Sequence, residues 1–170
     1  MHALIVVAHH EPRSLTHSVA TQIAEGLTRA NPANTREIAD LYAEGFQPVF
    51  GAADFAVHHR EAQPPADVLA EQARIDRVFS NGWAFDFAGD LKHVKKLQRL
   101  RVHLVGLAGA DERAYERHGY GPAMKAQIEH GIFDYSGATV VSSTLMVESE
   151  VRDPQEHLQT ARHIGAQMFT

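Results

Sequence analysis

Residues 3–16 read ALIVVAHHEPRSLT, and this stretch decides the fold. An apolar run typical of a strand, residues 3–7, leads into a polar loop and then into an amphipathic helix in which Val19, Ile23 and Leu27 recur four residues apart. The first turn of such a helix carries free N–H groups and the positive end of the helix dipole. A strand, a loop and a helix start in this order therefore predict a binding site for a phosphate-sized anion.

The rest of the chain alternates between strand and helix patterns. Further strands are expected over 35–39, 101–107 and 138–147, and helices over 16–29, 67–77, 122–132 and from Pro154 onward. This alternation predicts an α/β protein, with a doubly wound parallel sheet and helices on both faces. Ligands of such sheets bind beyond the carboxyl ends of the strands, so the loops 8–16 and 108–115 are expected to flank one site.

The composition narrows the class of protein. A chain of 170 residues without a break in composition predicts a single domain over residues 1–170, and a net charge of -5 argues against a nucleic-acid partner. The absence of cysteine excludes disulfides, thiolate metal sites and cysteine nucleophiles. No apolar stretch has the length of a membrane span and no secretion signal is evident, so we expect a soluble cytoplasmic protein without membrane insertion.

Several further motifs follow one another along the chain. They are Ala8-His9, Ser14-Leu15-Thr16, Asp40-Leu41-Tyr42, Ala70-Glu71-Gln72, Asp76-Arg77-Val78-Phe79, Gly82-Trp83-Ala84 and Ala108-Gly109. In this order they resemble the flavodoxin-like NAD(P)H:quinone oxidoreductases, a diaphorase-type family. The resemblance implies a flavodoxin-like fold, a non-covalent FMN reduced by NAD(P)H, two-electron transfer to a quinone or similar small-molecule acceptor, and a homodimer.

The resemblance also implies the site residues. The residues expected around the FMN phosphate and ribityl chain are His9, Ser14, Leu15 and Thr16. Those expected along the isoalloxazine edge are Leu107, Ala108 and Gly109. The expected catalytic residue is Tyr115, whose hydroxyl would stabilise charge on the reduced ring. From its chemistry, and not from the resemblance, His118 is a second expected catalytic residue, which would donate a proton to the acceptor.

Plainer interpretations stay open for some of these residues, and no metal site is expected. Adjacent histidines on an extended loop point to opposite sides, so His9-His10 is a weak metal pair. Tyr115 is equally well interpreted as a packing residue at the base of a loop, and His118 as a solvated side chain.

One part of the family's pattern is missing from this sequence. Residues 73–77 run straight into Val78, where family members carry a third strand, an aromatic flavin loop and a helix, so roughly two dozen residues are expected to be absent. That strand is central in the order 2-1-3-4-5, and its loss predicts a sheet of four strands, with none between Asp40 and Arg101. The loss also supports a second hypothesis, a flavodoxin-like regulatory or interaction subunit that no longer binds flavin.

Overall fold

The structure is a computed structural model, and it describes residues 1–46, 49, 51–53, 56, 63, 66, 69–70, 85–87 and 93–170. Its strands are β1 (His2–Val7), β2 (Thr35–Asp40), β3 (Phe85–Phe87), β4 (His93–Lys95), β5 (Arg101–Leu107) and β6 (Thr139–Met146). Its helices are α1 (Leu15–Ala30), α4 (Glu112–His118), α5 (Tyr120–Met124), the π-helix η1 (Lys125–Asp134) and α6 (Pro154–Gln167).

The four long strands that the sequence predicts are confirmed, and they pair in parallel. β1 pairs with β2 so that Val7 lies opposite Asp40, and β5 pairs with β6 so that Leu107 lies opposite Met146. Each of these partners is the last residue of its strand. The carboxyl ends of each parallel pair therefore lie level with one another, as the predicted fold class requires.

The strand count and the continuity of the sheet differ from the prediction. The described residues form six strands, because β3 pairs antiparallel with β4 between Asp40 and Arg101, where no strand was expected. Segments of three residues are too short to show a period of two in the sequence. The described strands also form three separate two-stranded sheets, so β1 is not paired with β5. The helix expected over 67–77 and the expected junction at 73–77 lie mostly or wholly outside the described residues.

The helices follow the local signals of the sequence. Ser14 caps α1 by accepting a hydrogen bond from the His17 amide, and Asp153 caps α6 by accepting one from the Gln155 amide. The helix expected over 122–132 is present as α5 followed directly by η1. Its second half has π-type hydrogen bonding, which the spacing of apolar residues does not distinguish from α-type.

Two glycines allow α1 and α6 to pack with their backbones in contact. A Cβ at Gly26 would lie 2.0 Å from the Arg162 carbonyl oxygen, and a Cβ at Gly165 would lie 2.0 Å from the Ile23 carbonyl oxygen. Any other residue at either position would push the helices apart. Leu27, next to this crossing, is fully buried.

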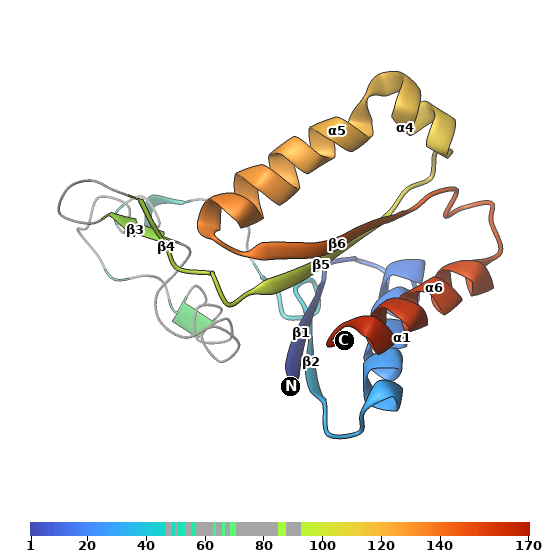
Figure 1. Ribbon diagram of the computed structural model, residues 1–170, viewed down its shortest axis with the longest axis horizontal. Coiled ribbons are helices and arrows are strands. Elements are labelled where there is room, and N and C mark those ends of the chain that lie inside the picture. The colour runs from blue at the N-terminus through green and yellow to red at the C-terminus, as the bar shows by residue number, and fades with distance from the viewer. Residues whose placement is uncertain are drawn as a thin grey trace.

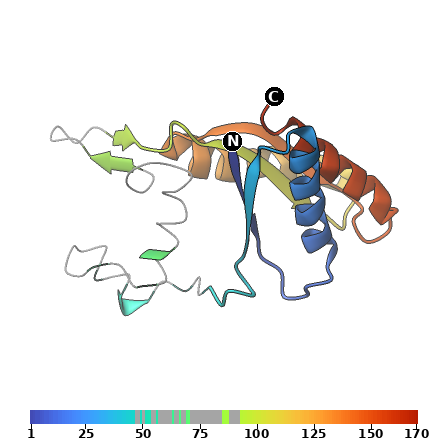
Figure 2. The same cartoon turned by 90° about the horizontal axis from the view of Figure 1, so that it is seen from below.

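The elements are arranged in layers around the two parallel pairs. Figure 1 shows α1 and α6 together on one side of β5–β6, and the arm formed by α4, α5 and η1 on the other side. Figure 2 shows α1 running back alongside β1 and next to α6. The main apolar cluster lies between this helix pair and the strands, and it contains Ile5, Ile23 and Ala161.

Candidate functional site

The two loops that the sequence predicts to flank one site, residues 8–16 and 108–115, both begin at the same apolar cluster. Val7, Leu107 and Met146, the last residues of β1, β5 and β6, belong to this cluster, and so does Leu15, the first residue of α1. The cluster therefore brings the carboxyl ends of β1 and β5 to one side of the core. The β1–α1 loop and the β5–α4 loop both begin at this side.

The start of α1 presents unused hydrogen-bond donors. The amides of Leu15 and Thr16 precede the first internal bonds of the helix and donate to no described residue, and the Thr16 hydroxyl also has no described partner. The Leu15 side chain packs in the apolar cluster, so its backbone is the part that a ligand could contact. Free amides and the positive end of the helix dipole together favour an anion at this point.

His9 is fixed by the loop that carries it. The Glu11 amide donates to His9 Nδ1 at 3.0 Å, so the proton of a neutral His9 ring is on Nε2, which is left as a donor. The ring stacks on His10 with centroids 4.7 Å apart, so the two rings lie on the same side of the loop and the expectation that they point to opposite sides is wrong. Glu11 in turn accepts from the Arg13 amide and lies 3.5 Å from Arg13 Nε, so the acidic side chain of this loop is paired within it.

A chain of hydrogen bonds connects the residue that caps α1 to β2, and the sequence alone does not predict this chain. Ser14 Oγ lies 2.9 Å from His17 Nδ1, and His17 Nε2 lies 2.8 Å from Asp40 Oδ2. Asp40 Oδ1 also accepts from the Tyr42 and Ala43 amides, each at 3.1 Å. The hydrogen bond from Ala43, and then that from His17, lowers the pKa of Asp40 below its ordinary value. A serine three residues before a histidine at a helix start was the available signal.

The β5–α4 loop is held by the β6–α6 loop. The Ala108 amide donates to the Met146 carbonyl at 2.9 Å, and the Ala108 carbonyl accepts from Ser149 at 2.9 Å. Ala108 itself is buried, whereas the amides of Gly109 and Ala110 donate to no described residue. This loop therefore offers two free backbone donors from a rigid support.

The two predicted catalytic residues lie on α4 beyond this loop. Tyr115 is half-buried and meets the Tyr120 ring edge to face, with centroids 5.6 Å apart. His118 is exposed and stacks on the same Tyr120 ring at 5.2 Å. The structure thus brings Tyr115 and His118 into one aromatic group, and it gives neither of them a hydrogen bond to the β1–α1 loop.

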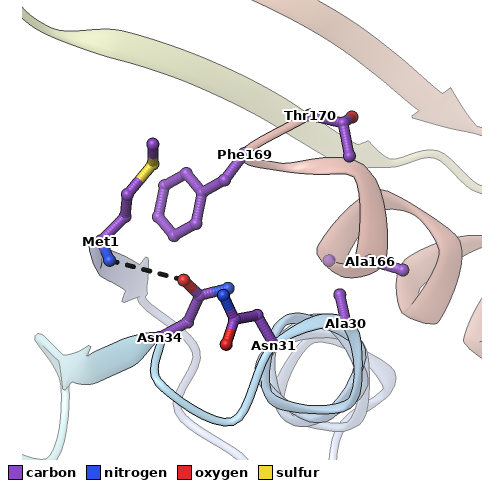
Figure 3. A pocket seen from close by; sticks show the side chains of 8 residues that line it. Met1, Ala30, Asn31, Asn34, Ala166, Phe169 and Thr170 are labelled. Atoms are coloured by element: carbon purple, nitrogen blue, oxygen red, sulfur yellow. Dashed lines mark hydrogen bonds between the residues drawn. The ribbon is translucent and has the colours of Figure 1, made fainter.

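A hollow of about 270 Å³ lies away from these loops (Figure 3). Its lining residues come from the start of the chain, the turn after α1 and the end of α6, and they are Met1, Ala30, Asn31, Asn34, Gly165, Ala166, Phe169 and Thr170. The terminal amine of Met1 donates to Asn34 Oδ1 at 3.4 Å across it. This hollow is at the amino end of β1, whereas ligands of parallel sheets bind at the carboxyl ends.

Two other classes of site are absent from the part of the chain that the structure describes. No helix there combines the length and apolar character that a membrane span needs. No group of three His, Asp or Glu side chains there is placed to hold a metal ion.

Fold and loops together define an α/β protein with parallel strands and an anion-type helix start at their carboxyl ends. The chain belongs to the Flavodoxin_2 family, described as having a flavodoxin-like fold, whose sequence profile matches residues 1–75 and 73–167. Comparison with curated proteins found no significant match.

Solved structures with the same fold include several reductases. An NAD(P)H:quinone oxidoreductase from Methanothermobacter marburgensis aligns with a TM-score of 0.77 and 20% identity, over 100% of this chain and 98% of its own. A putative quinone reductase from Klebsiella pneumoniae aligns with a TM-score of 0.79 and 19% identity, over 100% of this chain and 85% of its own. An FMN-dependent NADH-azoreductase from Bacillus anthracis, solved with FMN, aligns with a TM-score of 0.60 and 14% identity, over 98% of this chain and 96% of its own. At these identities the likeness establishes the fold.

Proposed function

We propose that this protein is an FMN-dependent NAD(P)H oxidoreductase that passes two electrons to a quinone or a similar small acceptor. The observation that carries the proposal is the pair of donor-bearing loops, 8–14 and 108–111, which leave one apolar cluster at the carboxyl ends of β1 and β5. The names of the similar structures, two quinone reductases and an azoreductase solved with FMN, support the same cofactor and acceptor class.

The donors at the start of α1 fit a phosphate monoester. Ser14 and Thr16 supply hydroxyls, Leu15 and Thr16 supply free amides, and His9 supplies Nε2–H. Several N–H and O–H donors converging with a helix dipole suit the oxygens of a phosphate dianion. In this proposal these four residues hold the phosphate and ribityl chain of FMN.

The β5–α4 loop suits the edge of a flavin ring. Leu107 is part of the apolar cluster and Ala108 is buried, so both offer apolar support, while the free amide of Gly109 offers a donor. A Cβ at Gly109 would lie 3.4 Å from Glu150 Oε1, so glycine there lets the β6–α6 loop pack closely against this loop. Bound FMN would supply the hydride chemistry, and the protein would position it and exclude water.

Tyr115 and His118 are proposed to act on protons and charge at the reacting end. Tyr115 carries a hydroxyl that can stabilise negative charge on the reduced ring, and His118 carries a ring nitrogen that can deliver a proton to the acceptor. Both side chains contact the ring of Tyr120. Substituting Tyr115→Phe is expected to slow turnover more than it weakens FMN binding.

A homodimer is proposed as the working form. Apolar side chains are exposed along the arm, with Tyr120 at 49% and Ile132 at 56% of their surface. Exposed apolar residues on one helical arm are typical of an interface between subunits. Light scattering coupled to gel filtration tests this, and a monomer at all concentrations would contradict it.

Titration of the full chain with FMN tests the function. Ser14→Asn and Ser14→Asp both keep a residue that caps helices well, but only aspartate places a negative charge beside the phosphate. Ser14→Asp is expected to weaken FMN binding by roughly 30-fold or more, because like charges brought together at a binding site cost several kcal/mol. Riboflavin, which lacks the phosphate, should be unaffected by the same change.

Thr160→Ala is the control for loss of a hydroxyl away from these loops, because among the described residues the Thr160 hydroxyl bonds only to the Glu156 carbonyl within α6, at 3.0 Å. The FMN complex is then mixed with NADH or NADPH alone, and a soluble benzoquinone is added afterwards. Bleaching of the flavin absorbance, followed by recovery on adding quinone, is the expected result. A wild-type protein that binds no FMN would refute the proposal.

A second function is supported by a different observation, the separation of β1–β2 from β5–β6. The two segments matched by the family profile meet at residues 73–75, where the sequence predicts the loss of a central strand. This supports a regulatory or interaction subunit that has kept the fold and lost its flavin. Cooperative thermal unfolding with no shift on adding FMN would favour it over the oxidoreductase.

A further inference from the structure

His17 is the residue through which Ser14 is joined to β2. It takes part in two side-chain hydrogen bonds, one from Nδ1 to Ser14 Oγ at 2.9 Å and one from Nε2 to Asp40 Oδ2 at 2.8 Å. The side chains of His17 and Asp40 keep 18% and 25% of their surface exposed, so the pair is shielded but not sealed. This chain of atoms ends on the hydroxyl proposed to bind phosphate.

The hydrogen bonds fix where one proton on His17 must be. Asp40 is held ionised, because the Ala43 amide and then His17 donate to it and lower its pKa. An ionised carboxylate only accepts, so His17 Nε2 carries a proton in both states of the ring. Nδ1 is therefore the atom that changes: it accepts from the Ser14 hydroxyl when the ring is neutral and donates to Ser14 Oγ when the ring is charged.

The Ser14 hydroxyl has one hydrogen to donate. While His17 is neutral, that hydrogen points to Nδ1, and the Ser14 oxygen also accepts from the His17 amide at 3.4 Å. When Nδ1 is protonated, the hydrogen of Ser14 is released and can point to an anion at the Leu15 and Thr16 amides. We propose that His17 is a positioning residue for the phosphate site, and that phosphate binding draws a proton onto its Nδ1. This inference rests on the proposed function.

The charged groups around His17 agree with this assignment. Asp40 at the end of β2 faces Nε2 and stabilises a charged ring, while the His9 ring approaches edge-on at 6.2 Å from the β1–α1 loop. In the same loop, Glu11 lies 3.5 Å from Arg13, so their charges largely cancel. Among the described residues, Asp40 is thus the charged group in direct contact with His17.

A purely structural role for His17 makes a different prediction. If the ring only fastens α1 to β2, replacing it lowers the stability of the protein and changes neither the protons bound with FMN nor the preference for FMN over riboflavin. If it positions Ser14, both quantities change. Binding and proton uptake are reciprocally linked, so either one reports the coupling.

Calorimetric titration of the full chain with FMN, in HEPES and in Tris at about pH 8, measures the proton uptake. At this pH the phosphate of FMN is already a dianion, so any proton taken up on binding is taken up by the protein. Wild type is expected to take up about one proton per FMN and none with riboflavin. His17→Gln, which cannot titrate, is expected to take up none and to bind FMN about tenfold more weakly.

His163→Gln is the matched control, because His163 is exposed on α6, and it should behave as wild type. Asp40→Asn is the second variant, expected to weaken FMN binding at about pH 8 and to restore it near pH 6, where histidine protonates more readily. FMN binding by wild type without proton uptake, or equal uptake by His17→Gln, would overturn this inference alone. No FMN binding by wild type would overturn the proposed function and this inference with it.

Discussion

Replacing Gly26 by alanine tests the packing on which the whole site is built. The new Cβ would lie 2.0 Å from the Arg162 carbonyl oxygen, where ordinary contact begins at 3.4 Å. The backbones of α1 and α6 must then separate by more than 1 Å, since a carbonyl in a helix cannot turn away. Overpacking of this kind costs about 3 kcal/mol, which outweighs the gain of up to about 1 kcal/mol from replacing a helical glycine.

Thermal unfolding of the full chain measures the result. A net loss of about 2 kcal/mol corresponds to a fall in Tm of roughly 4–8 °C for a chain of this size. Thr21→Ala is the control, because Thr21 is exposed on the same helix and alanine has the higher helix propensity, so this change should be neutral or slightly stabilising. A Gly26→Ala protein as stable as wild type would refute the close approach of α1 and α6.

Three further predictions concern stability. Leu27→Ala removes a fully buried side chain and should cost about 3 kcal/mol in denaturant unfolding, whereas Val151→Ala, at a side chain 79% exposed, should change stability by less than about 0.5 kcal/mol. Burial lowers the pKa of His103 below 6.5, so the folded protein favours the neutral ring. The stability of the protein should therefore be full above pH 6.5 and fall in more acid solution. In unfolding measured as a function of pH, His103→Gln should reduce that fall. The pKa of Asp40 is lowered from 3.8, so its stabilising contribution is present above pH 3.8 and is lost as the pH falls further. In unfolding measured from about pH 2 to 4, Asp40→Asn should reduce this loss of stability.

The parts of the fold that the sequence predicts are those specified by nearby residues. Ser14 caps α1 and Asp153 caps α6 because each is followed by amides that its own side chain reaches. The β5 strand was predicted from a run of apolar residues within 101–107, and its carboxyl end follows from the same run. The donors at the start of α1 are local in the same sense, so the candidate phosphate loop could be predicted without a structure.

The contact between His17 and Asp40 is not specified by nearby residues, because it joins residues 23 positions apart in the sequence and depends on the register of the strands. Parallel pairing places Asp40 opposite Val7, the residue from which the β1–α1 loop departs. A slip of one residue in β2 would turn the Asp40 side chain to the other face and leave His17 without a carboxylate. Neither short segment encodes that register alone, because it depends on how β2 pairs with β1. The hydrogen-bond donors of the candidate site are therefore set by the local sequence, whereas the proton on His17 depends on a tertiary contact. Variants that shift the register of β2 should remove the effect of Asp40 on His17 and leave the donors in place.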